Sequence, residues 1–163
     1  EKVVTVIGKD GSSKTIKAMI GTRISEVFQA LDIDVNENDR VIINGPMQGF
    51  ATFTLSHPVQ PTMDSIMVQE VSDIPAISDY PCINCGKCIK ICPANIPVNL
   101  LVRHLEANMF EDAAEKFDLQ SCIECGLCGY VCTARIPLFQ YIRLGMHELS
   151  KIRAEAETEE RNG

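Results

Sequence analysis

The sequence predicts an α+β protein in which a small β-sheet domain precedes a mostly helical domain. Short β-branched runs separated by turn residues dominate the first 70 residues. Apolar residues at helical spacing dominate the chain beyond residue 80. All eight cysteines lie in two closely spaced runs within that second part, so we expect its function to depend on them.

The expected sheet begins with a hairpin, because a turn sequence at residues 9–12 separates two strand-like runs. A helix is expected over residues 23–31, where apolar residues recur at helical spacing and Thr22 can serve as the N-cap. Residues 44–49 are interpreted as a tight turn between strands, not as a phosphate-binding loop. The expected strands are residues 3–7, 13–18, 40–43, 50–55 and 65–69.

This order of strands and one helix predicts a sheet domain of the β-grasp type over residues 1–70. The domain shows no catalytic constellation, and His57 is interpreted as a surface loop residue. No G-x-G-x-x-G or P-loop pattern occurs in the sequence, so no nucleotide site is expected. We expect a linker at residues 71–80, a helical domain over residues 81–152 and a charged tail at residues 153–163, either a fraying helix end or disordered.

The helical half contains one unit twice. Residues 82–103 (CINCGKCIKICPANIPVNLLVR) align with residues 122–143 (CIECGLCGYVCTARIPLFQYIR) at a constant offset of 40. The alignment matches all four cysteines of each unit and also pairs Arg103 with Arg143. A repeated unit predicts two structurally related halves packed with pseudo-two-fold symmetry.

Each repeated unit should end in a helix that starts near Pro97 or Pro137, since proline is tolerated in the first helical turn. Gly145 should allow a close approach to the second of these helices, and a further short helix is expected over residues 111–117. The expected apolar faces are Val98, Leu101, Val102, Leu105 and Met109 in the first helix, and Leu138, Tyr141, Ile142, Leu149 and Ile152 in the second.

Both cysteine runs have the spacing C-x2-C-x2-C-x3-C, which is typical of ligands to cubane iron–sulfur clusters. Three such cysteines can bind three irons from one loop, and the fourth ligand must come from elsewhere. In two-cluster ferredoxins the last cysteine of each run serves the other cluster. We therefore expect two 4Fe-4S clusters with exchanged fourth ligands. Cluster A would take Cys82, Cys85, Cys88 and Cys132, and cluster B would take Cys92, Cys122, Cys125 and Cys128.

The residues between the cysteines fit this interpretation. Gly86 and Gly126 would allow the positive φ of a loop folded closely over sulfur. Thr133 stands where the first run has Pro93, so the second exit is less rigidly set. The side chains expected to cover the clusters are Ile83, Ile91, Ile123 and Val131.

Other uses of the cysteines fit the spacing less well. Zinc prefers two C-x2-C pairs from two loops, and tight triplets are a poor framework for disulfides. Clusters with a purely structural role stay open, but two cross-ligated clusters lie close enough for electron hopping. His104 and His147 lie within the expected helices and are interpreted as surface residues, not as ligands.

The net charge of −7 argues against nucleic acid as a partner, because phosphate binding needs clustered Lys and Arg. No signal sequence and no apolar run of about 18 residues occurs, so we expect a cytoplasmic, reducing location. The chain begins at Glu1 and not at Met, so we expect it to be processed or to be a piece of a longer protein.

The sequence resembles the RnfC family, a peripheral component of the Rnf electron-transport complex. The second cysteine unit (residues 122–143) resembles the family's second cluster motif, and IINGPMQGFATF (residues 42–53) resembles its Gly-Pro-Met-x-Gly segment. The resemblance covers roughly residues 2–150 and implies a soluble ligand-binding β-grasp (SLBB) domain followed by a ferredoxin domain with two 4Fe-4S clusters. The family's larger N-terminal flavin- and NADH-binding module has no match here, so FMN and NAD are not expected in this chain.

Electron transfer through two 4Fe-4S clusters is therefore the leading hypothesis, in a domain or truncated subunit of an Rnf-like, ferredoxin- and NAD-linked complex. The expected partners are other redox subunits or a ferredoxin or flavoprotein, with peripheral contact to membrane subunits at the cytoplasmic membrane. One alternative is a binding or assembly module whose clusters are structural. Another is the redox arm of a soluble oxidoreductase.

Overall fold

The computed structural model describes residues 1–74 and 80–162 of the chain. The chain divides into two compact units, Glu1–Pro75 and Ala76–Gly163. A five-stranded mixed sheet with a helix forms the first unit, and helices form the second. The predicted α+β class is therefore confirmed.

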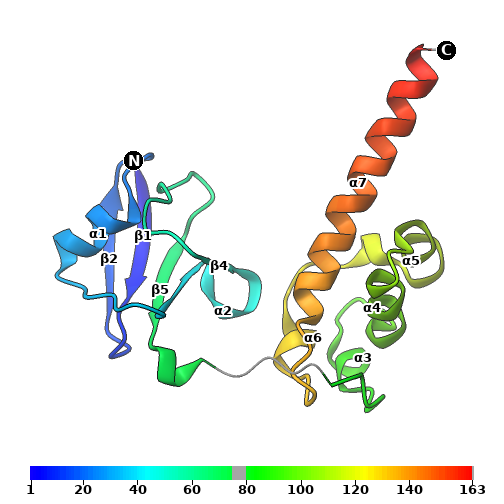
Figure 1. Ribbon diagram of the computed structural model, residues 1–163, viewed down its shortest axis with the longest axis horizontal. Helices are drawn as coiled ribbons and strands as arrows, with labels where there is room; N and C mark the ends of the chain where they lie inside the picture. Colours follow the sequence, from blue (N-terminus) through cyan, green and yellow to red (C-terminus); the bar gives the residue numbers. More distant parts are fainter. Residues whose placement is uncertain (75–79, 163) are drawn as a thin grey trace. The chain divides into compact units, whose positions relative to one another are not determined.

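The sheet of the first unit has the strand order β2-β1-β5-β3-β4. β1 pairs antiparallel with β2 and parallel with β5, while β3 lies antiparallel between β5 and β4. Helix α1 follows the β1-β2 hairpin, which gives the predicted β-grasp arrangement (Figure 1). The elements are β1 Lys2–Ile7, β2 Ser13–Ala18, α1 Ile24–Leu31, β3 Arg40–Ile43, α2 Gly45–Gln48, β4 Phe50–Thr52, β5 Ser65–Gln69 and the 3-10 turn η1 Val71–Asp73.

One apolar core joins α1 to the sheet. Val4 and Val6 of β1 are buried, as are Ile66 and Val68 of β5, because alternate residues of a strand point to the same face. Burial of each such side chain contributes about 1.5–3 kcal/mol. The helix adds Ile24, Val27 and Phe28 to the same core.

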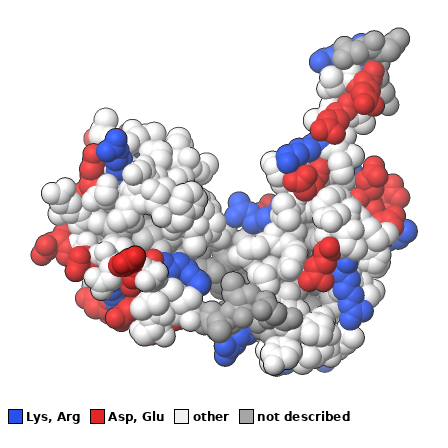
Figure 2. All heavy atoms as spheres, in the orientation of Figure 1, with Lys and Arg blue, Asp and Glu red and all other residues white. Residues whose placement is uncertain are grey.

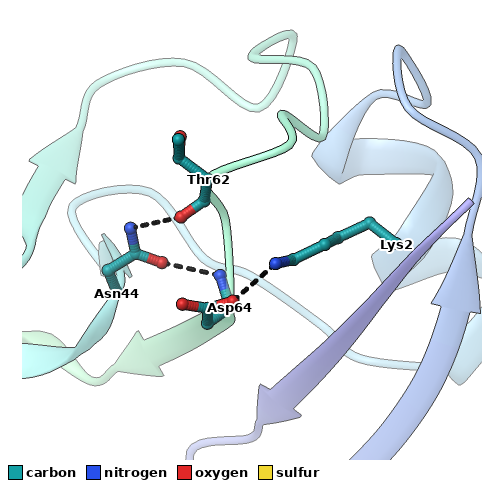
Figure 3. A network of polar contacts seen from close by, with 4 residues as sticks. All are labelled: Lys2, Asn44, Thr62 and Asp64. Carbon is teal, nitrogen blue, oxygen red and sulfur yellow. Dashed lines mark hydrogen bonds and ion pairs between the residues drawn. The ribbon is translucent and has the colours of Figure 1, made fainter.

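Asn44 ties the end of β3 to the segment that precedes β5 (Figure 3). Its amide nitrogen donates to the carbonyl of Thr62 at 3.0 Å, and its amide oxygen accepts the backbone N–H of Asp64 at 2.8 Å. The Asp64 carboxylate pairs with Lys2 Nζ of β1 at 2.6 Å. Asn44 adopts a φ of 63°, a left-handed conformation that asparagine tolerates better than most residues.

The segment after Asn44 differs from the predicted tight turn. Residues 45–48 form one helical turn, α2, in which Pro46 occupies the first turn, where its missing N–H costs nothing. Gly49 closes this turn by donating its N–H to the carbonyl of Gly45 at 2.9 Å. A Cβ added at Gly49 would lie 1.9 Å from the carbonyl oxygen of Ile43, so no other residue fits there.

Two predicted boundaries also shift. β4 ends at Thr52, three residues before the predicted end, because Thr52 Oγ1 accepts the N–H of Thr54 at 3.3 Å and forms a local turn. The N-cap of α1 is Arg23 and not Thr22. The Glu26 carboxylate accepts the backbone N–H of Arg23 at 3.2 Å and so supplies the cap from inside the helix.

The second unit is built from short helices that gather beside the N-terminal part of one long helix, whose C-terminal part extends beyond them (Figure 1). Pro97 is the N-cap of α4, and α5 covers the short helix expected at residues 111–117. The elements are α3 Lys87–Ile91, α4 Val98–Glu106, α5 Phe110–Phe117, the 3-10 turn η2 Leu119–Ser121, α6 Leu127–Tyr130 and α7 Leu138–Asn162.

The core of this unit uses most of the predicted apolar faces. The exception is Met109, which is 44% exposed because α4 ends at Glu106 and Met109 becomes the N-cap of α5. Tyr141 and Ile152 are only partly buried. The buried members are Val98, Leu101, Val102 and Leu105 of α4 and Leu138, Ile142 and Leu149 of α7.

Gly145 lies where α7 packs against Leu105 of α4. A Cβ added there would lie 2.4 Å from Cδ2 of Leu105, which is itself 3% exposed. The predicted close approach at Gly145 is therefore confirmed, and the packing of the two helices depends on the missing side chain.

The charged tail belongs to α7, which continues to Asn162. Its acidic side chains gather on the C-terminal part of the helix (Figure 2). Within residues 1–74 and 80–162, no helix is long and apolar enough to cross a membrane.

Candidate iron–sulfur centre

The two cysteine loops share one backbone conformation. Gly86 and Gly126 have φ values of 71° and 74°, so the predicted positive φ at both glycines is confirmed. Asn84 and Glu124, two residues before these glycines, also adopt left-handed φ values of 55° and 52°. Each glycine is the N-cap of a short helix, α3 or α6, and these two helices are in contact. The repeat in the sequence is thus a repeat in the structure.

A pocket opens over the first loop. Three cysteines of the first run and the last cysteine of the second run line it together. The cysteines are Cys82, Cys85, Cys88 and Cys132, which we call site A. The other side chains that line it are Ile83, Lys87, Asn99, Val102, Arg103, Glu106, Ala134, Ile136 and Leu138.

A contact between the two runs lies beside this pocket. The Sγ of Cys85 is 3.5 Å from Oγ1 of Thr133, the residue that stands in place of a proline. The backbone N–H of Lys87 and the Thr133 hydroxyl lower the pKa of the Cys85 thiol, and the Lys87 charge adds to this effect. Cys85 is exposed, and its thiolate is the form that binds iron.

The remaining thiols lie in less polar surroundings. Burial raises the pKa of Cys128 to about 11 and also raises the pKa values of Cys88 and Cys122. Negative charge on Cys125 and on Cys92 raises the pKa of Cys122 further. A bound metal would keep such thiols deprotonated, so ligation and deprotonation are coupled.

The cysteine sets are not arranged as a site for one ion. Among the described residues, no group of three or more His, Cys, Asp or Glu side chains could hold a single metal ion. A four-iron cluster takes one thiolate on each iron and needs its sulfur ligands spread around it. The four thiols that line one pocket fit this donor set.

The sequence pairs two arginines whose contacts only the structure shows. Arg103 Nη2 donates to Oδ1 of Asn84 at 2.7 Å, and Arg143 Nε lies 3.5 Å from Oε2 of Glu124. Each arginine lies on the helix at the end of its repeated unit, α4 or α7. Its side chain contacts the residue of the cysteine loop that has a left-handed φ, Asn84 or Glu124. In the sequence, the only sign of these two contacts was that Arg103 and Arg143 align in the repeat.

Ile83 lines the pocket of site A, as expected of a side chain that covers a cluster. Ile83 and Ile123 project from the cysteine loops, with exposed fractions of 64% and 65%. His57 lies in a loop, as predicted, but it is partly buried: its ring stands edge-on to Phe50, with 6.0 Å between the ring centroids.

The other two histidines lie outside the cysteine sites. His104 Nδ1 lies 3.0 Å from the carbonyl of Leu100, one turn earlier in α4, and its ring packs on Phe117. His147 is exposed on α7. Neither lines the pocket of site A.

A family model described as a 4Fe-4S dicluster domain matches residues 74–133. This match covers both cysteine runs. The second unit is therefore a 4Fe-4S dicluster region with eight cysteines for two clusters, and it is an electron-transfer domain.

The chain is similar to proteins that are named as the C component of ion-translocating or proton-translocating oxidoreductase complexes. The chain is 36% identical over 119 residues to this component from Methanosarcina acetivorans, covering 73% of this chain and 27% of the relative. It is 33% identical over 144 residues to the C component of the proton-translocating ferredoxin:NAD(+) oxidoreductase complex of Clostridium ljungdahlii, covering 88% and 32%. It is 37% identical over 158 residues to the ion-translocating C component of Edwardsiella ictaluri, covering 94% and 19%.

The chain is thus a homologue in the RnfC family, which provides the C component of ion-translocating oxidoreductase complexes. It spans about a third or less of the length of these relatives.

Proposed function

We propose that the two cysteine runs exchange their last ligands and hold two 4Fe-4S clusters. Cluster A is assigned to site A. The observation that supports this assignment is the pocket lined by three cysteines of the first run and by Cys132 of the second. The contact of Cys85 with Thr133, next to Cys132, agrees with it. Cluster B, in what we call site B, is assigned to Cys92, Cys122, Cys125 and Cys128.

The reciprocal assignment for site B follows from the repeat. Helices α3 and α6 are in contact, and the charge of Cys92 acts on the thiol of Cys122. Cys92 and Cys132 occupy equivalent positions in the two halves of the repeat. If Cys132 of the second half binds at the first loop, then Cys92 of the first half is expected to bind at the second loop. When bound, the clusters supply one-electron redox chemistry. The protein supplies the thiolates and the contact between α3 and α6 that joins the two halves of the repeat.

The proposed function is the relay of single electrons through these two clusters within an Rnf-type complex. The homologous proteins are named for complexes that couple oxidoreduction to ion translocation, one of them for ferredoxin:NAD(+) oxidoreduction. The partners of this chain are accordingly other redox subunits of such a complex, with a peripheral position at the cytoplasmic membrane. No FMN or NAD site is proposed within the chain.

Ligand exchange is tested with a matched pair of variants, Cys92→Ser and Cys132→Ser. Anaerobically purified protein is analysed for iron and sulfide content and by EPR after dithionite reduction. Cys92→Ser is expected to damage the cluster held by Cys122, Cys125 and Cys128, and Cys132→Ser the cluster held by Cys82, Cys85 and Cys88. Cys82→Ser and Cys122→Ser provide reference spectra for each site. A Cys92→Ser spectrum that matches the Cys82→Ser spectrum would show that the ligands are not exchanged.

The same reduction experiment tests electron transfer against a structural role. Two clusters that accept electrons reversibly, with spin coupling between the reduced centres, support the relay. Clusters that are lost together with the fold when they are reduced would favour the assembly module instead.

A further inference from the structure

The two halves of the repeat carry different charges around the same cysteine framework. Lys87 lies between Cys85 and Cys88 and lines the pocket of site A. The residue 40 positions later is Leu127, which has no charge. The first loop thus places one positive charge at its cluster site that the second loop lacks.

The arginine contacts also make the surroundings of the first loop more positive than those of the second. Arg103 donates to the neutral amide of Asn84, whereas Arg143 pairs with the carboxylate of Glu124. Glu124 lies within the second loop, two residues after Cys122. The second loop therefore contains a negative charge at the position where the first loop has none.

The charge balance includes one opposing group. Glu106 lines the pocket of site A together with Lys87 and Arg103, which leaves one net positive charge there. The corresponding groups of the second half are Leu127, Arg143 and Met146, and with Glu124 they have no net charge. Site A keeps the more positive surroundings after Glu106 is counted.

A polar side chain adds an independent difference. Asn99 lines the pocket of site A, and its Oδ1 is buried with no hydrogen-bond partner among the described residues. A half-turn of the amide exchanges Oδ1 with the donor Nδ2, which can then donate to a cluster sulfur. The counterpart of Asn99 is Phe139, a buried ring that cannot donate a hydrogen bond.

These differences act on the reduction potential of a bound cluster. One-electron reduction makes a cluster and its four thiolates more negative by one charge. Nearby positive charge and hydrogen bonds to sulfur stabilise the reduced form and raise the potential, while a nearby carboxylate lowers it.

We propose that Lys87 and Asn99 at site A, and Glu124 and Phe139 at site B, make the cluster of site A the easier one to reduce. This inference rests on the proposed assignment of the ligands. An electron that enters at site B would then pass to site A, so the chain has a built-in direction for electron flow.

The test is an EPR-monitored redox titration of the cluster-loaded chain, with the Cys82→Ser and Cys122→Ser spectra used to assign the signals. In the unmodified chain the site A signal should appear first as the solution potential is lowered. Lys87→Leu and Asn99→Leu should each shift the reduction equilibrium of site A roughly threefold to tenfold toward the oxidised form. A tenfold shift corresponds to about 59 mV for one electron.

Glu124→Asn should shift site B in the opposite direction and narrow the difference between the two sites. Lys90→Leu is the matched control, because Lys90 is exposed on α3 and does not line the pocket. The Lys90→Leu change should shift the reduction equilibrium of site A, and that of site B, by less than about twofold. Iron and sulfide analysis of each variant excludes partial cluster loss as the cause of a shift.

Two clusters that are reducible at equal potentials, or a Lys87→Leu variant that shifts site B instead, would overturn this inference and leave the relay intact. Clusters that bind but accept no electron reversibly would overturn the proposed function itself.

Discussion

The two units of the chain differ in how much of their core the cysteines provide. The core of the first unit is made of aliphatic side chains with Phe28 and Met63, and no cysteine contributes to it. The core of the second unit includes Cys88 and Cys128, and Cys82 and Cys122 pack against it. The first unit therefore depends on apolar burial alone, whereas the second should share its folding energy with metal ligation.

Removal of the clusters should give the largest difference in stability between the two units. An iron chelator under anaerobic conditions is expected to abolish hydrogen-exchange protection in helices α3 to α7 while β1 to β5 stay protected, because only the second unit loses ligands from its core. Exchange measured by mass spectrometry resolves the two units. Equal loss of protection in both units, or none in either, would contradict the comparison.

Truncation of a core side chain in the first unit should destabilise that unit and leave the clusters intact. Ile66 is fully buried in β5, so Ile66→Ala should lower the free energy of unfolding of this unit by about 2–5 kcal/mol. Iron content and EPR spectra should stay unchanged. Leu101→Ala is the matched change in α4 of the second unit, and it should lower iron retention as well as stability. Iron loss from the Ile66→Ala protein would show that the units depend on each other.

An added side chain at Gly145 should test the packing of α4 on α7. Gly145→Val should destabilise the second unit by about 1–3 kcal/mol, because its Cβ would overlap Leu105. Leu144→Val introduces the same residue at the neighbouring, 51% exposed position and serves as the control. Thermal melts of the cluster-loaded proteins compare the two. Equal melting temperatures of the two variants would mean that α4 and α7 can move apart without a measurable loss of stability.

The smallest expected effect concerns Asp39 in the first unit. Its side chain is 1% exposed, pairs with Lys9 at 2.5 Å and accepts the N–H of Asn36 at 2.6 Å. The hydrogen bond from Lys9 lowers the pKa of Asp39 below its ordinary value. The stability from this group is therefore present above the unfolded pKa of about 3.9 and is lost as the pH falls through the lower folded value.

Asp39→Asn should consequently lower the melting temperature of the first unit at pH 7, and the difference from the unmodified chain should shrink as the pH is lowered below about 4. Glu37→Gln, an exposed change of the same charge in the same loop, should have little effect at either pH. A deficit of the Asp39→Asn protein that is constant with pH would mean that the charge of Asp39 is not what stabilises the loop.

Local signals in the sequence predicted the elements that depend on short-range chemistry. The strands at residues 13–18, 40–43 and 65–69 have the predicted bounds, and Gly86 and Gly126 adopt the predicted φ. The spacing of the cysteines was enough to indicate iron–sulfur ligands. Thr22 is not the cap because the helix begins at Ile24, one residue later than predicted, so that Arg23 occupies the N-cap position.

Contacts between distant parts of the chain could not be predicted in this way. Met109 fits the apolar stripe of α4, yet it is exposed because the chain leaves that helix earlier. The match of Arg103 with Arg143 was visible, but their different partners were not, because a contact 19 residues away depends on how the loop folds back on the helix.

The sequence by itself determined the ligand types, their number and their division into two equivalent runs, because cluster chemistry depends on thiolates at short, regular spacing. The ferredoxin pattern also predicted that Cys132 joins the cysteines of the first loop, and the pocket of site A agrees with this prediction. Only the tertiary structure decided which charged side chains lie beside these thiols. Cys132 lies 44 to 50 positions after the cysteines that share its pocket, and Arg103 lies 19 positions after Asn84, so packing of the chain and not local propensity brings these residues together.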